Sequence, residues 1–333
     1  MSIERVFDAC GVGNGLLDIC IQVSEEELAR TSLQKGAMTL AEPAAQKDLL
    51  EQLAAKDKVM MGGGSIANSI AAVAQLGGKA ALLTRTGNDH YGKEYRRDFL
   101  NLGIGLGDLQ GRDGPTGTCI SLLTPDGERT MQTALGVSAD FCPEDITPGM
   151  VEKSRWLLVE GYLILNPGAG LEGVQLAVSR AREAGCEVAL SFSDAWLVKG
   201  QHAVLSRLVD HCSLIFCNEE EAVTFTGAGS ATEAFQQLCR RVGGVAMTAG
   251  ARGAYCAWKG DQVYVPGVQV RAVDTTGAGD MFAGAMLYGI CQNIPLEAAV
   301  KGACGLCARV VSQAGARLSG GIRGLWEQAG RVE

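Results

Sequence analysis

The stretch DTTGAGDMFAGA at residues 274–285 decides how we interpret the fold and carries the clearest chemical pattern of the chain. Gly277 and Gly279 stand where a helix is predicted to begin, and glycine leaves the backbone N–H groups there unobstructed. These groups and the helix dipole favour an anion, such as a phosphoryl group whose negative charge grows during transfer. Asp280 follows directly, and its carboxylate is placed to accept the proton of an attacking hydroxyl. An acidic residue in the first turn also simply stabilises a helix, so this stretch alone leaves both interpretations open.

Outward from this stretch, short apolar segments alternate with helical ones. Continuous apolar segments between helices are typical of parallel strands that are buried under helices on both faces. We therefore predict an α/β fold with strands at 156–160, 187–192, 213–217 and 244–248, separated by helices at 170–184, 201–210 and 231–242. An antiparallel pair is expected at 254–258 and 262–265, and two helices, at 278–291 and 296–313, close the chain.

The N-terminal part contains strands that do not fit a parallel sheet. These are 16–23, 37–41 and a hairpin over 117–135, whose turn is marked by Asp126–Gly127. We predict that they form a small separate sheet, attached by several crossings and placed to act as a lid. The body continues with strands from residue 6 and at 80–84 and with helices at 46–58, within 62–78 and at 91–102. The expected division is a large α/β unit of residues 1–13, 46–111 and 141–333 and a small β unit of residues 14–45 and 112–140.

Composition limits the classes of function. The 333 residues include 29 basic and 37 acidic side chains, a net charge of −8, without a Lys- or Arg-rich stretch, which argues against a nucleic-acid partner. No apolar run reaches the ~18 residues of a membrane span, and we expect neither a membrane segment nor a secretory signal. We therefore expect a cytoplasmic protein. Its thiols should be reduced and mostly buried, including those of Cys304 and Cys307.

A second stretch, GGGSIANSIAAVAQLGG at 62–78, is a glycine turn followed by an alanine-rich helix that ends in Gly-Gly. Together the two stretches resemble the N- and C-terminal signatures of the PfkB, or ribokinase-like, carbohydrate and nucleoside kinases. The resemblance implies the ribokinase-like three-layer α/β/α fold, with a mostly parallel sheet and a small β-sheet lid. It also implies ATP and Mg²⁺, with a monovalent cation as a further candidate. Asp280 would be the catalytic base, and Gly277, Ala278 and Gly279 would form the anion hole.

Two further motifs fit this family. Asn218 and Glu221 match its N-x-x-E pattern, which organises Mg²⁺ and phosphate through water, so Glu221 is the residue implied on the metal side. The family's T-x-G-x-x-G nucleotide loop falls on Thr248, Gly250 and Gly253. Without the resemblance, the acidic run at 219–221 is more typical of a solvated helix N-terminus, and the loop is an unremarkable strand-to-turn sequence.

The N-terminal strands resemble the adenosine-kinase-like branch of the family. There the Asp after Gly-Asn binds the vicinal hydroxyls of a ribose, which implies Asp18, with Asn14 beside it, as a substrate ligand. A carboxylate suits this task because its two oxygens accept two hydroxyl protons. The same sugar pocket would be lined by Gly64, Ser65 and Asn68. Read alone, Asp18 is more typical of a charge on the surface of a strand.

The hairpin at 117–135 and the helix predicted at 296–313 contain residues that could indicate the substrate. Arg129 matches a lid arginine that reaches the transferred phosphate, although alone it would be a hairpin-turn charge. Cys304 stands where the branch often carries Asn or His near the adenine. The residues available to stack on a base could equally be core or rim residues: Leu16, Leu40, Met131, Tyr162 and Trp196. The choice between nucleoside and free sugar therefore stays open.

Two other classes of protein fit less well. Gly11-x-Gly13 after the first strand suggests a dinucleotide-binding oxidoreductase, but Leu16 stands where that motif needs its third glycine. A non-catalytic sugar- or nucleoside-binding protein on the same fold would most simply lack the base, which Asp280 provides. We predict a kinase, a monomer or homodimer, that phosphorylates a hydroxymethyl group of a small-molecule nucleoside or sugar. Adenosine or a related ribosyl compound is the first candidate, and a free sugar such as ribose or fructose is the alternative.

Overall fold

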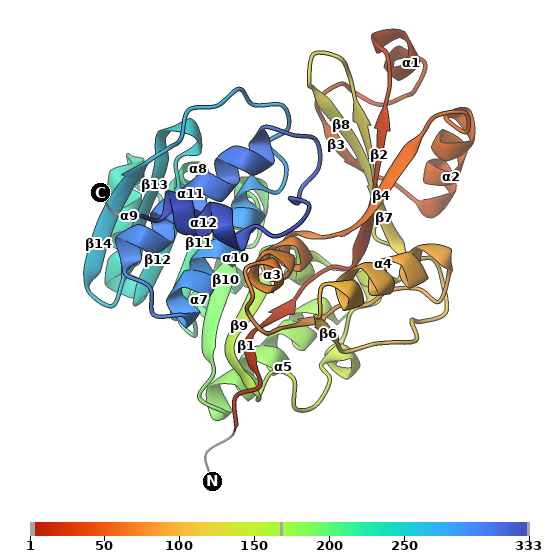
Figure 1. The fold of residues 1–333 in the computed structure, drawn as a ribbon. Helices are drawn as coiled ribbons and strands as arrows, with labels where there is room; N and C mark the ends of the chain where they lie inside the picture. Colours follow the sequence, from red (N-terminus) through yellow and green to blue (C-terminus); the bar gives the residue numbers. More distant parts are fainter. Residues whose placement is uncertain (1–3, 167–168, 332–333) are drawn as a thin grey trace.

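The computed structural model describes residues 4–166 and 169–331. A nine-stranded sheet runs through the large body of the molecule (Figure 1). Its strands follow in the order β14 (Asp261–Pro266), β13 (Gly253–Trp258), β12 (Gly244–Thr248), β11 (Leu214–Asn218), β10 (Glu187–Ser191), β9 (Ser154–Glu160), β1 (Phe7–Val12), β5 (Ala80–Leu83) and β6 (Gly105–Leu106). Neighbours from β12 to β6 pair in parallel, and β13 pairs antiparallel with both β12 and β14. The predicted mostly parallel sheet is confirmed.

Helices cover both faces of this sheet. One face carries α3 (Ser65–Gln75), α4 (His90–Asn101), α10 (Ala278–Cys291), α11 (Leu296–Val311) and α12 (Arg323–Ala329). The other face carries α5 (Gly170–Glu183), α6 (Ala195–Gly200), α7 (His202–Val209), α8 (Glu219–Thr226) and α9 (Ala231–Arg241). Trp156 and Leu158 of β9 enter the first core, whereas Leu157 and Val159 enter the second. The strands are apolar throughout because successive side chains point to opposite faces, and both faces are buried.

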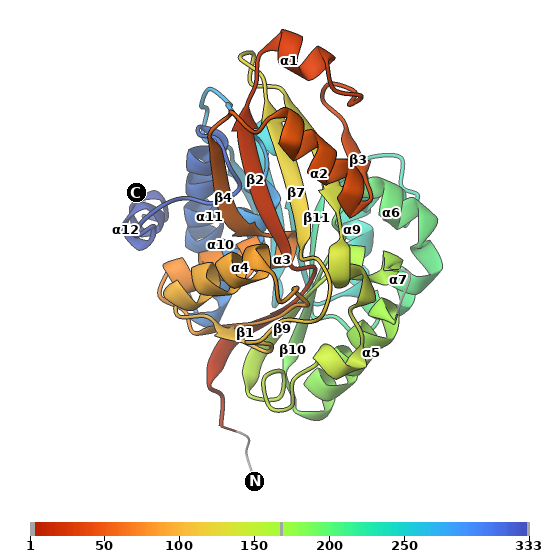
Figure 2. The same ribbon diagram turned by 90° about the vertical axis from the view of Figure 1, so that its right-hand side faces the viewer.

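A second, five-stranded sheet lies above the body (Figure 2). Its order is β3 (Met38–Leu40), β8 (Arg129–Ala134), β7 (Gly117–Leu123), β2 (Leu16–Gln22) and β4 (Lys58–Gly63), which confirms the predicted small sheet and its hairpin. Leu17, Ile19 and Ile21 of β2 are buried in a core shared with α1 (Glu25–Ala29) and α2 (Pro43–Gln52). Asp18 and Cys20 alternate with them and therefore point to the opposite face of the sheet.

The predicted helix over 46–58, and the domain boundary at residue 46, are wrong in part. α2 ends at Gln52, and β4 begins at Lys58 and pairs antiparallel with β2 in the small sheet. The Lys58 ammonium stabilises the turn between them, because it donates to the carbonyls of Leu53 and Ala54 at 3.2 and 3.4 Å. Residues 43–63 thus accompany the small sheet, and the large unit resumes with α3.

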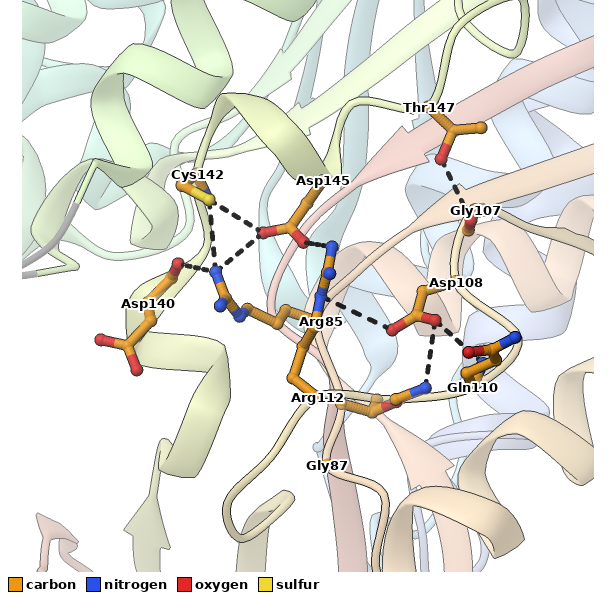
Figure 3. A network of polar contacts seen from close by, with 12 residues as sticks. Arg85, Gly87, Gly107, Asp108, Gln110, Arg112, Asp140, Cys142, Asp145 and Thr147 are labelled. Carbon is orange, nitrogen blue, oxygen red and sulfur yellow. Dashed lines mark hydrogen bonds and ion pairs between the residues drawn. The ribbon is translucent and has the colours of Figure 1, made fainter.

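Four crossings connect the small sheet to the body: after β1, after β4, before β7 and after β8. A polar network ties the last two together (Figure 3). The buried carboxylate of Asp145, which follows β8, lies 2.8 Å from Nη2 of Arg112, which precedes β7. Arg85, just after β5, lies 3.3 Å from the same carboxylate and also donates to the carbonyl of Asp140. The small sheet is therefore fastened to the end of β5 as well as to its own connecting segments.

Candidate active site

Asp280 lies where the first turns of two helices meet. Ser65 Oγ donates to one oxygen of its carboxylate at 2.7 Å, and Asn68 Nδ2 donates to the other at 3.0 Å. Ser65 and Asn68 belong to the start of α3, and Asp280 to the start of α10. The predicted C-terminal and N-terminal signatures therefore meet at one carboxyl group.

The surroundings of Asp280 favour its protonated form more than water does. Burial raises the pKa of Asp280 to about 6, and the hydrogen bonds from Ser65 and Asn68 oppose this shift. A carboxyl group with a pKa near 6 is ionised at neutral pH yet is more basic than a solvated aspartate. This combination suits a group that removes a proton from an alcohol.

The backbone before Asp280 is shaped by Gly277. This residue caps α10 in the left-handed conformation, with φ at +74°, and a Cβ there would lie 2.3 Å from the carbonyl oxygen of Ala316. The Ala278 N–H makes a long contact with the carbonyl of Thr275, at 3.3 Å. A Cβ at Gly279 would meet no atom within 4 Å, so the backbone there is open to a ligand. First-turn N–H groups have no acceptor inside their helix, so this geometry is compatible with the anion site that the sequence predicts.

Asn68 has one polar atom without a partner. Its side chain is 5 % exposed, and its Nδ2 is used on Asp280, but its Oδ1 has no hydrogen-bond partner among the described residues. A buried carbonyl without a donor is costly, which favours a ligand that supplies one.

Asp18 lies among charged groups of both polarities. Burial raises the pKa of Asp18 to about 6, and the guanidinium groups of Arg129 and Arg317 oppose this shift. Arg129 Nη1 lies 3.2 Å from a carboxylate oxygen of Asp274, and Arg317 pairs with Asp98. Asp98 in turn accepts a bond of 2.9 Å from the N–H of Gly62. Both arginines therefore have a carboxylate partner of their own beside Asp18.

Arg129 is held beside the glycine turn by two side chains. The ion pair with Asp274, directly before the glycine turn, is already formed, and Arg129 Nη2 also donates to Ser121 Oγ at 2.6 Å. The physical reason is that Asp274 is itself buried and needs a counter-charge.

Asp18 faces a cavity of about 530 Å³ between the small sheet and the segment Ala314–Ala316. Cys20, Val59, Met61 and Leu123 line it from the same face of the sheet. The face continues at the far edge through Met38 and Leu40, which are 50 % and 62 % exposed. The face that Asp18 shares thus has exposed apolar side chains at its two edges, whereas Ser121 and Thr133 between them are buried.

Glu221 is buried, unlike Glu220, and the interpretation of the whole acidic run as a solvated turn is therefore wrong. Asn218 and Glu221 bond each other reciprocally: Glu221 N–H donates to Asn218 Oδ1, and Asn218 N–H and Nδ2 donate to the Glu221 carboxylate, all at 2.8–3.0 Å. Burial raises the pKa of Glu221 to about 7; the backbone N–H of Asn218 opposes this shift, and the carboxylate of Asp194 adds to it. Both residues line a cavity of about 100 Å³ together with Asp280 and Thr248.

The predicted nucleotide loop opens onto a further cavity, of about 260 Å³. Thr248, Gly250 and Gly253 line it from one side, and Ala278 and Gly279 line it at the start of α10. Cys304 and Cys307 line it from α11, so packing in the core does not fully describe their positions. The structure thus joins the loop, the anion site and the Asn218–Glu221 pair through adjoining cavities that share Thr248 and Gly279.

Asn14 lies in a buried network next to the pocket. Its side chain donates to Glu160 at 2.9 Å and accepts from Ser138 and Asn166 at 2.9 and 3.1 Å, so most of its bonding capacity is used inside the protein. The backbone carbonyl oxygen of Asn14 lies close to Gly64, which has φ at +97°. A Cβ at position 64 would lie 2.2 Å from that oxygen. The structure therefore gives Asn14 and Gly64 supporting positions rather than free polar atoms.

The sequence interpretation missed Glu160, Asp274 as a partner of Arg129, and Arg317. Glu160 ends β9, is 1 % exposed, and accepts N–H groups from Asn14 and, at 3.2 Å, from Ile66 at the start of α3. Burial raises the pKa of Glu160 to about 7. A charged residue at the carboxyl end of an apolar strand was the available signal, because ligands of parallel sheets bind at that edge.

Known proteins share this architecture over most of its length. The model of the pfkB family carbohydrate kinases matches residues 39–320. Ribokinase of Mus musculus is 31 % identical over 253 residues, 72 % of this chain and 75 % of that protein. Adenosine kinase 2 of Arabidopsis thaliana is 25 % identical over 329 residues, 92 % of this chain and 94 % of that protein. The solved structure of adenosine kinase from Sinorhizobium meliloti superposes with a TM-score of 0.87 at 29 % identity and covers 97 % of this chain and 99 % of that one. The chain therefore belongs to the pfkB family of carbohydrate kinases, phosphotransferases that act on hydroxyl groups, and it has their ribokinase-like fold.

Proposed function

We propose that this sugar or nucleoside kinase transfers the γ-phosphoryl group of ATP to a hydroxymethyl group of a ribosyl nucleoside, with Asp280 as the base. The observation that carries the proposal is the meeting of the two helix N-termini at Asp280, held by Ser65 and Asn68 beside the open backbone of Gly279. Asp280 accepts the hydroxyl proton as the hydroxyl oxygen bonds to phosphorus and the bond to the ADP oxygen breaks. The N–H groups around Gly277–Gly279 hold the oxygens of the phosphoryl group as their charge grows.

The chain's own residues fit a nucleotide and Mg²⁺. Asn218 and Glu221 present oxygen atoms, the ligand type that Mg²⁺ prefers, at the cavity that Asp280 also lines. When bound, Mg²⁺ would neutralise phosphate charge, held by Glu221 through water. Thr248, Gly250 and Gly253 would line the nucleotide site. A monovalent cation remains part of the proposal only as a candidate activator.

The charges near Asp18 favour an uncharged phosphoryl acceptor. The carboxylates of Asp274 and Asp280 act on Asp18, and the two arginines near it are already paired with carboxylates. A phosphorylated or acidic sugar would meet net negative charge there. Asp18 would accept bonds from two hydroxyls, and the unpartnered Oδ1 of Asn68 would accept one more.

The apolar face of the small sheet favours a nucleoside over a free sugar. Leu40 and Trp196 are 62 % and 65 % exposed, and Leu16, Met131 and Tyr162 are partly exposed, so none of the five is fully buried. Exposed apolar side chains on the same sheet as a hydroxyl-binding carboxylate suit a base attached to a ribose. A free-sugar kinase is the second candidate, because ribokinase of Mus musculus is 31 % identical to this chain over 253 residues.

A screen of acceptors tests the proposal. ADP release with MgATP would be measured for nucleosides, ribose, fructose and sugar phosphates. We expect the highest kcat/KM for a ribosyl nucleoside and no turnover with sugar phosphates. A higher kcat/KM for free ribose or fructose would favour the second candidate. ATP binding without turnover of any acceptor would favour a non-catalytic binding protein.

We propose that the protein acts on a small-molecule substrate, binds neither nucleic acid nor a membrane, and is a cytoplasmic monomer or homodimer. In the residues that the structure covers, we find no helix with the length and apolar character needed to cross a bilayer.

Asp18→Ala is expected to raise KM for the hydroxylated substrate by roughly ten- to a hundredfold, the effect of ~1.5–3 kcal/mol for hydrogen bonds to a charged group. KM for ATP should stay the same, because Asp18 lies on the small sheet, away from the nucleotide cavity. Steady-state kinetics in both substrates would measure this. Asp113→Ala, at an exposed loop position, is the control. An unchanged KM with a lowered kcat would contradict the role of Asp18.

We propose that the small sheet closes over bound substrate and excludes water from the phosphoryl group. Amide hydrogen exchange over 117–134 should slow when substrate and a non-hydrolysable ATP analogue are both present, and stay the same in β10 of the central sheet. Equal exchange with and without ligands would show that the sheet is static.

A further inference from the structure

The nucleotide cavity has a wall with little capacity for directional hydrogen bonds. α11 lines it with Cys304, Cys307, Ala308 and Val311. Burial raises the pKa of Cys304 to about 11, so the thiol is neutral at pH 7, and a neutral thiol is a weak donor and a weak acceptor. Cys307 Sγ already donates to the carbonyl of Ala278 at 3.2 Å. This wall therefore offers a base contact area but no strong polar partner.

The other polar side chains that line the cavity are committed elsewhere. Thr248 also lines the smaller cavity with Asp280, and Thr275 stands directly before the glycine turn, so both belong to the phosphate end. Gln269 is exposed at the rim, and its Nε2 donates to the carbonyl of Ala251 at 3.1 Å.

The backbone of the nucleotide loop is also largely used. The carbonyls of Ala249, Ala251, Arg252 and Gly253 accept bonds from within the protein, at 2.7–3.2 Å. Within the described part of the chain, the backbone of residues 268–272 makes no hydrogen bond. A peptide group has both a donor and an acceptor, so it can serve adenine and guanine alike.

We propose that this cavity does not distinguish the purine bases, and that GTP replaces ATP as the phosphoryl donor with a kcat/KM within about tenfold. A site built on hydrogen bonds rejects a wrong partner by ~10⁴–10⁵, whereas an apolar pocket discriminates by only ~10–200-fold. The proposal rests on the proposed function for its nucleotide site but adds which donors that site accepts. GTP would yield GDP and the same phosphorylated acceptor.

Equilibrium binding tests this without turnover. The Mg²⁺ complexes of AMPPNP and GMPPNP would be titrated calorimetrically into the full chain, and we expect dissociation constants within about tenfold of each other. Binding of AMPPNP more than about a hundredfold tighter would overturn the proposal, as would binding of neither analogue. If both bind equally but no acceptor in the screen is phosphorylated, the proposed function fails while this inference holds. With an active acceptor, kcat/KM for ATP and GTP gives the second readout.

Cys304→Asn assigns the effect to one residue. An amide in this wall can pair with the donor and acceptor edge of adenine, so the preference for AMPPNP over GMPPNP should rise at least about tenfold. Cys239→Asn is the matched control, because Cys239 is a half-buried thiol on α9 that lines none of these cavities. An unchanged ratio in Cys304→Asn would show that Cys304 does not face the base.

Discussion

Asp280→Asn is expected to lower kcat by ~10²–10⁴, the usual contribution of a positioned general base. The amide keeps the size of the side chain and one acceptor for Ser65 or Asn68, so the fold and nucleotide binding should persist. Kinetics and analogue titration on the same preparation separate the two effects. Asp261→Asn, at an exposed position of β14, is the control. Turnover near the unmodified level would remove Asp280 from the mechanism.

The pH profile gives an independent measure of the same group. Because the pKa of Asp280 is raised to about 6, kcat/KM should fall as pH drops below 6, on the order of tenfold per pH unit, as the base becomes protonated. Unfolding would not explain this loss of activity.

Burial also raises the pKa values of Asp18, Glu160 and Glu221 to about 6–7, so between pH 5.5 and 7 these groups bind more protons in the folded than in the unfolded chain. Their contribution to the free energy of unfolding therefore increases as pH falls through that window. Tm measured at pH 5.5 and 7 checks this. A Tm that falls together with the rate would contradict the interpretation.

Gly277→Ala is expected to lower kcat by ~10²–10³, the usual cost of losing one donor to a developing oxyanion. A Cβ at φ +74° is strained, and it would meet the carbonyl oxygen of Ala316 at 2.3 Å. The backbone of either segment must shift, and the N–H groups ahead of Asp280 then lose their alignment. Kinetics with saturating ATP and acceptor would measure the loss.

A matched substitution separates this local effect from the general effect of adding a methyl group. Gly324 lies in α12, and a Cβ there meets no atom within 4 Å. Gly324→Ala should leave kcat unchanged and should stabilise the fold by up to ~1 kcal/mol, because alanine favours a helix over glycine. If Gly277→Ala behaves like Gly324→Ala, the glycine turn has no role in transfer.

The sequence predicted the elements that have a clear local signal, such as a continuous apolar run or a hairpin turn. The continuous apolar strands 156–160 and 244–248 and the Asp126–Gly127 hairpin are present as expected. β4 could not be predicted from local pattern, because its strand character comes from pairing with β2. Short α1, with a single buried residue, Leu28, has too little periodicity to be recognised.

In the candidate site, too, residues with a local sequence signal could be predicted, whereas residues placed by long-range contacts could not. Asp280, Ser65 and Asn68 lie in stretches with a glycine turn and a helix, and the structure brings them into hydrogen-bond contact. Glu160 has only the weak signal of a charged residue at the carboxyl end of an apolar strand, and no local pattern identifies the partners of Asp274 and Arg317. Their positions depend on contacts between segments far apart in the chain, such as Arg129 with Asp274 and Arg317 with Asp98.

The four crossings between the two sheets also determine the order in which the chain folds. β2 pairs with β7 in parallel, so that residue 16 meets residue 117, and β1 pairs with β9, so that residue 7 meets residue 154. A ribosome releases the N-terminus first, so one edge of β2 stays unpaired until about a third of the chain has been synthesised, and one edge of β1 until nearly half has been. Pairings of such long range are slow to form because a large loop must close before each contact stabilises it. The small sheet lacks its last strand until residue 134 has been synthesised, and the large sheet until residue 266, so the candidate substrate pocket between them forms only when both are finished.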